Sequence, residues 1–440
     1  MIACFKGHFY QFMLHYGIIA IGSRGDVQPF VALSLGLLRK GNRVTLMAHE
    51  NFRSFVQDHG IDFHPLAGST EEILQSPEAV RHLQTGNTFR LLRSIHERGG
   101  KWQTQMNRDL WEGCLRPEVL VTGALGIHWI SSIAEKMGKR WAVIQLSFPT
   151  NATREFPFAG FDFPAFDFFK FPAYNRATFR LLRSFFWRRV KTSVNEHRQS
   201  LGLPALQQSI FDKADSEHIL TCYAVSPALL QRPADWDDNI QVTGFLSMPA
   251  LSNNASKNIP GKLLEWLGTG DRPIYIGLGS MPIPDPARFT RILRELLTRT
   301  SYRFIFCQGW SALPGLPLDS RFLVVPSIPH EWLFLQCQAA IIHGGVGTLA
   351  AALRAGIPTV VLSIFGDQHW WGKLILKRRL GCHITFKRLS VEKLMAAVQN
   401  VLAPEIAQNL AGLARELNGE DGLQNAVDRL EGYFLEGKQG

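Results

Sequence analysis

The sequence predicts an α/β protein made of two doubly wound domains, each with a parallel sheet. Three observations support this fold class. The chain has 440 residues, which is enough for two separate cores. Each half contains an apolar segment that runs into a glycine turn and then into a helical segment, at residues 16–40 and 339–355. Residues 246–261, which are rich in Asn, Ser, Pro, Lys and Gly, form a linker between the halves.

In the first half, apolar strands alternate with helical stretches. We expect strands at residues 16–21, 43–48, 119–122, 141–146 and 218–223, a helix from the turn at 22–26 to about Lys40, and helices near 71–83 and 86–112. A strand, helix and strand of this size form a right-handed crossover in a parallel sheet. We place this domain at residues 13–245, and we expect residues 1–12 to be a loosely packed or non-native leader.

The second half, residues 262–440, repeats this alternation. We expect helices at 262–267 and 286–299, strands at 274–278, 302–307, 322–326, 339–342 and 383–386, a strand after Pro358, and helices from Ser390 onward. The segment 424–434 favours a helix and lies beyond the last strand. It could therefore cross back to the first domain.

The composition is that of a globular protein, with 46% hydrophobic and 19% charged residues, and it excludes disordered and fibrous chains. The formal net charge of +10 permits attraction to anionic lipid or to phosphorylated substrates, although a basic surface without a specific partner fits equally well. The sequence has no zinc spacing and no RNA-binding strand motif, so nucleic acid is not an expected partner.

The cysteines indicate a reducing compartment. Six of them are scattered through the chain without a CxxC pair, which is typical of reduced core thiols in a cytosolic protein. We find no apolar run of spanning length and no signal-peptide pattern. The expected location is cytoplasmic, with peripheral contact at the inner face of a membrane as an extension of it.

The most informative segment, residues 343–368, combines an anion site with polar side chains suited to a sugar. It follows an apolar strand and opens a helix, whose unpaired N–H groups and positive dipole end attract a diphosphate. The expected phosphate ligands are His343, Gly344, Gly345, Gly347 and Thr348. A second strand then leads to Asp367 and Gln368, whose carboxylate and amide suit sugar hydroxyls. The alternative is a tight turn in which His343 is a packed polar residue.

This segment resembles the donor signature of nucleotide-sugar glycosyltransferases, in the branch that contains sterol glucosyltransferases and antibiotic glycosyltransferases. The run 365–372 is similar to that branch, although His369 and Trp370 stand where Pro and an aromatic residue are more usual. The resemblance implies the GT-B architecture, in which two Rossmann-like domains face each other across a cleft. It also implies a UDP-sugar or dTDP-sugar donor as co-substrate, with no other cofactor and no metal.

The resemblance further assigns three residues of the second half to the nucleotide. Ser280 adds a hydroxyl to the phosphates, and the uracil or thymine lies against Trp310 and the main chain around Ile328. An aromatic residue after a strand is often only packing, so a core position for Trp310 stays open.

Sugar transfer requires a base that takes the acceptor proton and an anion site for the leaving diphosphate. Asp26 is our candidate base, because the run 22–29 (GSRGDVQP) matches the branch of the family that uses an aspartate there. The alternative is a helix N-terminal carboxylate favoured by the helix dipole. A carboxylate of ordinary pKa, about 4, is a weak base, and burial in a closed cleft would strengthen it.

The stretch 156–187 is dense in aromatic residues and is interrupted by Pro157, Pro164 and Pro172, so we expect a loop rather than one helix or strand. Loops at strand ends bind substrates in this fold class. We expect this one to wall a pocket for a lipophilic acceptor, with Phe156, Phe158, Phe161 and Phe163 in the wall. Packing onto its own domain and contact with a membrane interface are the alternatives.

Together these features predict an inverting, metal-independent glycosyltransferase. It would pass a hexose, most simply glucose from UDP-glucose, to a hydroxyl of a sterol or a polyketide-like aglycone. One alternative is a nucleotide-sugar epimerase of the same fold, which needs several acid and base groups at the donor, whereas the segment offers only Asp367. Another is a non-catalytic donor-binding protein, against which the intact Asp26, His343 and Gln368 argue.

Overall fold

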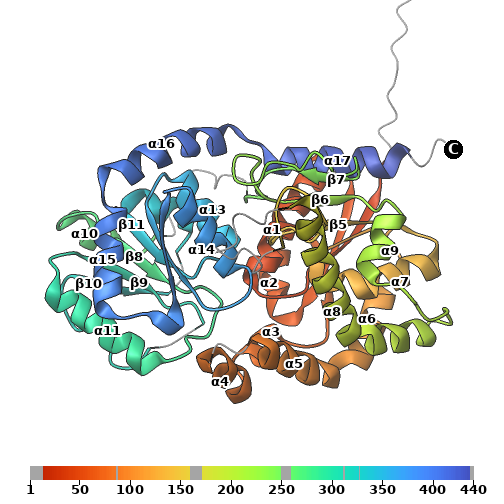
Figure 1. Cartoon of the computed structure of the whole chain (residues 1–440), viewed down its shortest axis with the longest axis horizontal. Coiled ribbons are helices and arrows are strands. Elements are labelled where there is room, and N and C mark those ends of the chain that lie inside the picture. Colours follow the sequence, from red (N-terminus) through yellow and green to blue (C-terminus); the bar gives the residue numbers. More distant parts are fainter. Residues whose placement is uncertain are drawn as a thin grey trace, which may run out of the picture.

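The computed structural model of the protein describes residues 13–85, 88–158, 171–248, 259–310, 313–326 and 328–436. In these ranges the chain forms two α/β domains, each built on a parallel sheet (Figure 1). The fold class predicted from the sequence is therefore confirmed. The leader 1–12 and most of the expected linker, residues 249–258, lie outside the described residues.

The first domain has a seven-stranded sheet in the order β3-β2-β1-β4-β5-β6-β7. The strands are β1 (His15–Ile19), β2 (Arg43–His49), β3 (Asp62–Leu66), β4 (Val119–Thr122), β5 (Arg140–Gln145), β6 (Thr221–Tyr223) and β7 (Ile240–Val242). In the centre, Ile18 pairs with Leu46 on one side and Val121 on the other. The central strands are apolar and buried because helices cover both faces of a parallel sheet.

The two strands that the sequence pattern did not reveal, β3 and β7, are the edges of this sheet. β3 is mostly half-exposed and contains Pro65, which an edge position tolerates. β7 has three residues. The covering helices are α1 (Arg24–Arg39), α2 (Arg53–Gln57), α3 (Thr70–Leu74), α4 (Pro77–Thr85), α5 (Thr88–Gly99), α6 (Gln103–Gly113), α7 (Ile127–Met137), α8 (Pro172–Ser200) and α9 (Ile210–Ser216).

The second domain has a six-stranded parallel sheet in the order β10-β9-β8-β11-β12-β13. Its strands are β8 (Ile274–Gly277), β9 (Phe304–Cys307), β10 (Phe322–Val325), β11 (Ala339–Ile342), β12 (Thr359–Ser363) and β13 (Gly381–Thr385). Its helices are α10 (Gly261–Gly268), α11 (Pro286–Arg299), α12 (His330–Leu333), α13 (Val346–Arg354), α14 (Gln368–Lys377), α15 (Val391–Val401) and α16 (Pro404–Gly419). The strands expected from the sequence are present, each within a few residues of its expected position.

The last helix, α17 (Gly422–Glu436), lies on the first domain, while α16 lies on the second (Figure 1). α17 packs against α1, where a Cβ added to Gly36 would meet Val427 at 2.9 Å, so the two helices can approach only because position 36 is glycine. Phe434 also reaches the central strand β1, with its ring 5.7 Å from that of Tyr16. The C-terminal helix therefore completes the core of the N-terminal domain.

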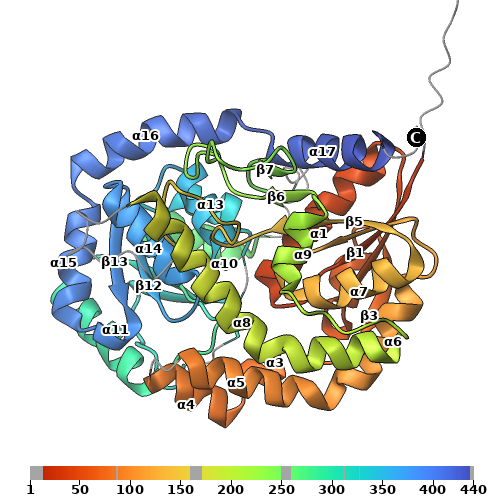
Figure 2. The same cartoon turned by 45° about the vertical axis from the view of Figure 1, so that its right-hand side comes forward.

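The aromatic stretch is not a loop along its whole length, because α8 begins at Pro172 and continues for 29 residues (Figure 2). The sequence pattern predicts that Pro172 interrupts regular structure, but Pro172 is the first residue of this helix. A proline is accepted there because the first N–H groups of a helix have no partner within the helix. Phe179, Phe185 and Trp187 thus lie on a helix rather than in a pocket-lining loop.

Candidate active site

Asp26 lies in the first turn of α1, directly after the turn that follows β1. The backbone N–H and the hydroxyl of Ser23 both donate to its Oδ2, at 2.7 and 3.0 Å. Gly22 has φ of 139°, and a Cβ at that position would overlap this carboxylate, so only glycine leaves room for it. Because both hydrogen bonds go to Oδ2, Oδ1 is the oxygen left for a substrate.

The carboxylates of Asp26 and Asp367 come from different domains and interact electrostatically. The pKa of Asp367 is raised to about 6, mainly by burial and secondarily by the negative charge of Asp26. Burial also raises the pKa of Asp26, against the opposing effect of the hydrogen bonds from Ser23. Trp371 Nε1 donates to Asp367 Oδ2 at 3.2 Å and fixes its orientation. The two domains thus bring these two buried carboxylates close to each other.

The turn between β11 and α13 uses its glycines for different reasons. Gly344 has φ of 90°, and a Cβ there would lie 2.6 Å from Val361 Cγ1, while a Cβ on Gly345 would overlap the ring of His343. At Gly347 an added Cβ would meet nothing within 4 Å. The first turn of α13 contains no acidic residue, and no side chain caps its N-terminus. This helix end is therefore open to an anion, next to the half-buried Thr348.

His343 is 9% exposed, and its Nδ1 has no hydrogen-bond partner among the described residues. Burial, together with the nearby His330, lowers the pKa of His343 to about 4. The imidazole is therefore neutral at pH 7 in the protein without ligand. It can donate a hydrogen bond to a phosphate, as expected of a phosphate ligand, but it adds no positive charge.

The turns after β8 and β9 come together beside His343. A Cβ on Gly279 would lie 2.8 Å from His343 Cε1, and Trp310 N donates to Gly279 O at 3.3 Å. The structure thus brings Ser280, Trp310 and His343 to the same edge of the sheet. Ser280 and Trp310 are half-buried and Ile328 is 7% exposed.

Gln368, the first residue of α14, is only 5% exposed, and its side chain braces the loop before it. Its Oε1 accepts hydrogen bonds from Ile364 N at 2.8 Å and Phe365 N at 3.1 Å. These contacts occupy the carbonyl oxygen, so Nε2 is the part of the amide that can reach a ligand.

Sequence reasoning missed several neighbours of the site. His330 forms a hydrogen bond between Nε2 and Tyr275 OH at 2.9 Å and stacks on Phe334 with ring centres 4.9 Å apart. Burial and the charge of Arg24 lower the pKa of His330 to about 4. Arg24 itself lies over the ring of Phe55 at 4.2 Å. The sequence carried no signal for the contacts of His330 with Tyr275 and of Arg24 with Phe55, because each joins segments far apart in the chain.

The described aromatic residues of the expected acceptor wall differ in exposure. Phe156 is half-buried, whereas Phe158 is 6% exposed and packs edge-on against Phe148 and Phe179, with ring centres 5.0 and 5.5 Å away. Phe158 therefore packs within its own domain, which is the alternative to a place in the acceptor wall. Phe161 and Phe163 lie outside the described residues.

Among the described residues, no group of three or more His, Cys, Asp and Glu side chains could hold a metal ion. Across the same part of the chain, we find no helix with the length and apolar character needed to cross a membrane.

Two family models match the chain. The glycosyltransferase family 28 N-terminal domain matches residues 16–107, and the erythromycin biosynthesis protein CIII-like C-terminal domain matches residues 310–430. The first match lies in the first domain, and the second covers much of the second domain and the beginning of α17. They define the protein as a nucleotide-sugar glycosyltransferase.

Solved structures share the fold over almost the whole chain. The glycotransferase of kitacinnamycin is 18% identical, covers 95% of this chain and 98% of its own, and has a TM-score of 0.69. The calicheamicin glycosyltransferase CalG4 covers 96% and 99% at 16% identity, with a TM-score of 0.65. VinC, solved in complex with DTDP, covers 97% and 100% at 15% identity, with a TM-score of 0.63. These similarities establish the GT-B fold.

Curated relatives narrow the class to one family. A sterol 3-beta-glucosyltransferase of Arabidopsis thaliana is 32% identical over 429 residues, which cover 94% of this chain and 67% of the plant protein. A second one from that plant is 31% identical and is covered over 66% of its length. A third, from Aspergillus terreus, is 32% identical but is covered over only 29%. The chain belongs to the sterol 3-beta-glucosyltransferase family, and these matches favour a glycosyltransferase over an epimerase.

Proposed function

We propose that the protein is an inverting glycosyltransferase that passes glucose from UDP-glucose to the hydroxyl of a sterol or a similar lipophilic acceptor. One observation carries this proposal: the buried carboxylates of Asp26 and Asp367, from opposite domains, interact with each other, and the N-terminus of α13 in the second domain is not capped by a side chain. A base on the acceptor side and an anion site on the donor side are the two parts that the reaction needs.

In the proposed reaction, Asp26 Oδ1 takes the proton of the acceptor hydroxyl as the hydroxyl oxygen attacks the anomeric carbon. The bond between that carbon and the diphosphate breaks, and UDP leaves. The raised pKa of Asp26 makes it a stronger base than an exposed aspartate. A single displacement inverts the configuration at the anomeric carbon.

The donor diphosphate would lie at the N-terminus of α13, beside Gly347, Thr348 and the hydroxyl of Ser280. The N–H groups and the positive end of the helix dipole would stabilise the leaving group, with a hydrogen bond from neutral His343. We propose that these N–H groups, the helix dipole and His343 stabilise the leaving diphosphate without a resident metal ion. Full activity in the presence of EDTA supports this arrangement, and loss of activity that Mg²⁺ restores contradicts it.

Asp367 would accept hydrogen bonds from the glucose hydroxyls, and Gln368 Nε2 would donate to one of them. This pair places the anomeric carbon in line with the attacking oxygen. The uracil would lie near Trp310 and Ile328. The choice of glucose and of a sterol rests on the names of the plant and fungal relatives.

The test is to incubate the purified protein with UDP-glucose and a panel of sterols and aglycones, and to detect UDP release and product mass. We expect release to require acceptor, and we expect NMR of the product to show a β-glucoside. A parallel reaction with dTDP-glucose shows whether the protein prefers a uracil or a thymine nucleotide in the donor. UDP-glucose converted to another UDP-hexose without acceptor would identify an epimerase, and no turnover with any acceptor would contradict the proposal.

We also propose that the outer face of α8 contacts an anionic membrane surface, from which a sterol would be taken. Leu181 is 63% exposed and Phe171 is 61% exposed, and the exposed Arg180, Arg188 and Arg189 lie along the same helix. An amphipathic helix with apolar and basic side chains on its outer face binds lipid interfaces.

Sedimentation with vesicles tests the membrane contact. We expect the protein to bind vesicles of phosphatidylcholine with phosphatidylglycerol more than vesicles of phosphatidylcholine alone. Leu181→Glu should reduce this binding, while Leu264→Glu, at a residue 48% exposed on α10, should not. Equal binding of both variants and the wild type would contradict a role for α8.

A further inference from the structure

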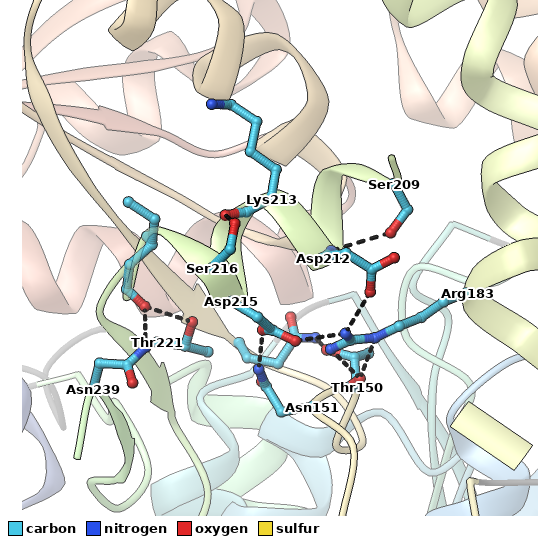
Figure 3. A network of polar contacts seen from close by, with 12 residues as sticks. Thr150, Asn151, Arg183, Ser209, Asp212, Lys213, Asp215, Ser216, Thr221 and Asn239 are labelled. Atoms are coloured by element: carbon cyan, nitrogen blue, oxygen red, sulfur yellow. Dashed lines mark hydrogen bonds and ion pairs between the residues drawn. The ribbon is translucent and has the colours of Figure 1, made fainter. Parts of the chain in front are cut away.

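A partly buried polar network in the first domain includes none of the groups that the proposed reaction uses, and Figure 3 shows it from close by. It joins α8 and α9 to the segment of residues 146–158, which leaves the carboxyl end of β5. At that end of a parallel sheet, loops bind the substrate. The network is therefore placed to control the shape of the acceptor side of the cleft.

Arg183 is the centre of the network, and its side chain is only 11% exposed. Nε and Nη2 donate to the backbone carbonyl of Thr150 at 3.3 and 3.1 Å, and Nη1 donates to Asp212 and Asp215 of α9 at 3.1 and 2.5 Å (Figure 3). The planar guanidinium thus links two helices and the segment in a fixed geometry. A lysine could keep the charge but not all of these bonds.

Tyr223, at the end of β6, also binds Thr150 and, in addition, its neighbour Asn151. Its hydroxyl accepts from Thr150 N at 2.9 Å and Asn151 N at 3.1 Å, and it donates to Asn151 Oδ1 at 2.6 Å. Asn151 Nδ2 in turn donates to Asp215 at 3.0 Å, next to Arg183. The contacts form a closed ring of bonds around Thr150 and Asn151.

The segment stays attached as far as its last described residue. Asp235 accepts from Thr153 Oγ1 at 2.6 Å and Arg154 N at 2.9 Å, and Phe158 N donates to Thr178 Oγ1 of α8 at 2.8 Å. Surface loops usually have few such bonds and are mobile. This one is built as a fixed element.

We propose that Arg183 is a positioning residue for acceptor binding, which acts by holding residues 150–158 in one conformation. The wall that includes Phe156 is then formed before the acceptor arrives, so binding does not have to order it. This inference rests on the proposed function, because it assumes that the acceptor binds along this segment. A purely structural role would instead change stability without a selective effect on the acceptor.

Steady-state kinetics of Arg183→Lys, Tyr223→Phe and the double variant test the proposal. Arg108→Lys, at an exposed residue of α6 in the same domain, is the matched control. Tyr223→Phe keeps the ring that stacks on Trp236 at 5.0 Å and removes only the hydroxyl. We expect each single variant to raise the acceptor KM about tenfold, because each loses hydrogen bonds that hold the segment, while the donor KM stays as in the wild type.

Two further readouts make the test specific. The double variant should raise the acceptor KM by less than the product of the single effects, since both residues hold one segment. Trypsin should cleave faster after Arg154 in both single variants but not in Arg108→Lys. The inference would be overturned if the wild type is active and the variants keep the acceptor KM and the cleavage rate of the wild type. It would also be overturned if the variants lose only kcat or only Tm. A wild type that glucosylates no lipophilic acceptor would overturn the proposed function instead.

Discussion

The turns from β1 into α1 and from β11 into α13 have the same order of strand, glycine and helix, but they differ in how the N-terminus of the helix is capped. Both follow a buried strand, use a glycine with positive φ and open a helix. In α1 the protein satisfies the helix end itself, because Asp26 and Ser23 form a capping box. In α13 the N-cap is Gly345, no side chain caps the helix, and the first turn has no acid. The first end has its own carboxylate, and the second is left for the anion of a ligand.

This difference explains how one type of unit can give both parts of the site. The carboxylate in the first turn of α1 is held by the backbone N–H of Ser23, and burial raises its pKa, as the proposed base requires. The same position without a carboxylate binds phosphate. A glycine turn alone does not predict which helix end binds the donor. The presence or absence of a side chain that caps the helix is the feature that predicts it.

The largest effect should come from removing the carboxylate of the first turn. We expect Asp26→Asn to lower kcat by about 100-fold or more, because general-base catalysis contributes at least that much, while the affinity for UDP stays nearly unchanged. Asparagine can still accept the hydrogen bonds from Ser23, so the turn should fold. Quenched-flow or coupled kinetics and UDP titration measure the two quantities. Near-normal turnover would remove Asp26 from the mechanism.

The reverse change makes the second turn resemble the first. Gly347→Asp places a carboxylate in the first turn of α13, where an added side chain meets open space. Repulsion of the diphosphate should weaken UDP binding about tenfold, which calorimetry can measure. Gly347→Asn, of the same size without the charge, is the control and should bind UDP more tightly than the aspartate variant. Equal affinities for the two would mean that the diphosphate does not lie at this helix end.

A paired change sharpens the division of the second domain into phosphate and sugar parts. His343→Ala removes the imidazole from the diphosphate site and should weaken both UDP and UDP-glucose. Asp367→Asn should leave UDP affinity unchanged and raise the KM for UDP-glucose, because it touches only the sugar. We expect changes of a few-fold to tenfold, which is typical for one hydrogen bond. If both variants lost UDP affinity equally, the two residues would not serve separate parts of the donor.

Much of this arrangement could be predicted from the sequence, since a glycine turn between an apolar strand and a helix is a local pattern. The turns at Asp26 and His343 are of this kind, and the structure places both where parallel strands end. The edge strand β3 was missed because its half-exposed, proline-containing sequence has no apolar run. The roles assigned to the site residues stay predictions that the experiments above test.

The remaining features depend on contacts between distant parts of the chain. The neutral state of His343 follows from burial beside His330, and the raised pKa of Asp367 follows partly from Asp26, more than 300 residues away in the sequence. Oε1 of Gln368 binds its own loop, a use of the amide that the residue type alone does not reveal. The start of α8 at Pro172 was misjudged because a proline can end one segment and begin the next.

The smallest expected effect is on thermal stability. The sign of its pH dependence distinguishes a buried carboxylate such as Asp367 from a carboxylate in an ordinary ion pair. The pKa of Asp367 is raised from 3.8 to about 6 in the folded protein, so the folded state holds the proton more tightly than the unfolded state. The stability that this contributes below pH 4 is lost as the pH rises through 6. Asp367→Asn cannot ionise, so it should have a Tm about 2–4 °C above the wild type at pH 8 and little difference at pH 4.

Glu135→Gln is the control of opposite sign for this prediction. The pKa of Glu135 is lowered by hydrogen bonds from Arg198 and Lys213, so its ionised form stabilises the folded protein above its ordinary pKa. Its replacement should therefore lower Tm at pH 8, and the loss should shrink as the pH falls toward 4. Calorimetric scans of the three proteins between pH 4 and 8 measure both trends. A lower Tm for Asp367→Asn at pH 8 would show that Asp367 is a stabilising residue of its own domain rather than a carboxylate held ready in the cleft, and the contrast between the two turns would then rest on Asp26 alone.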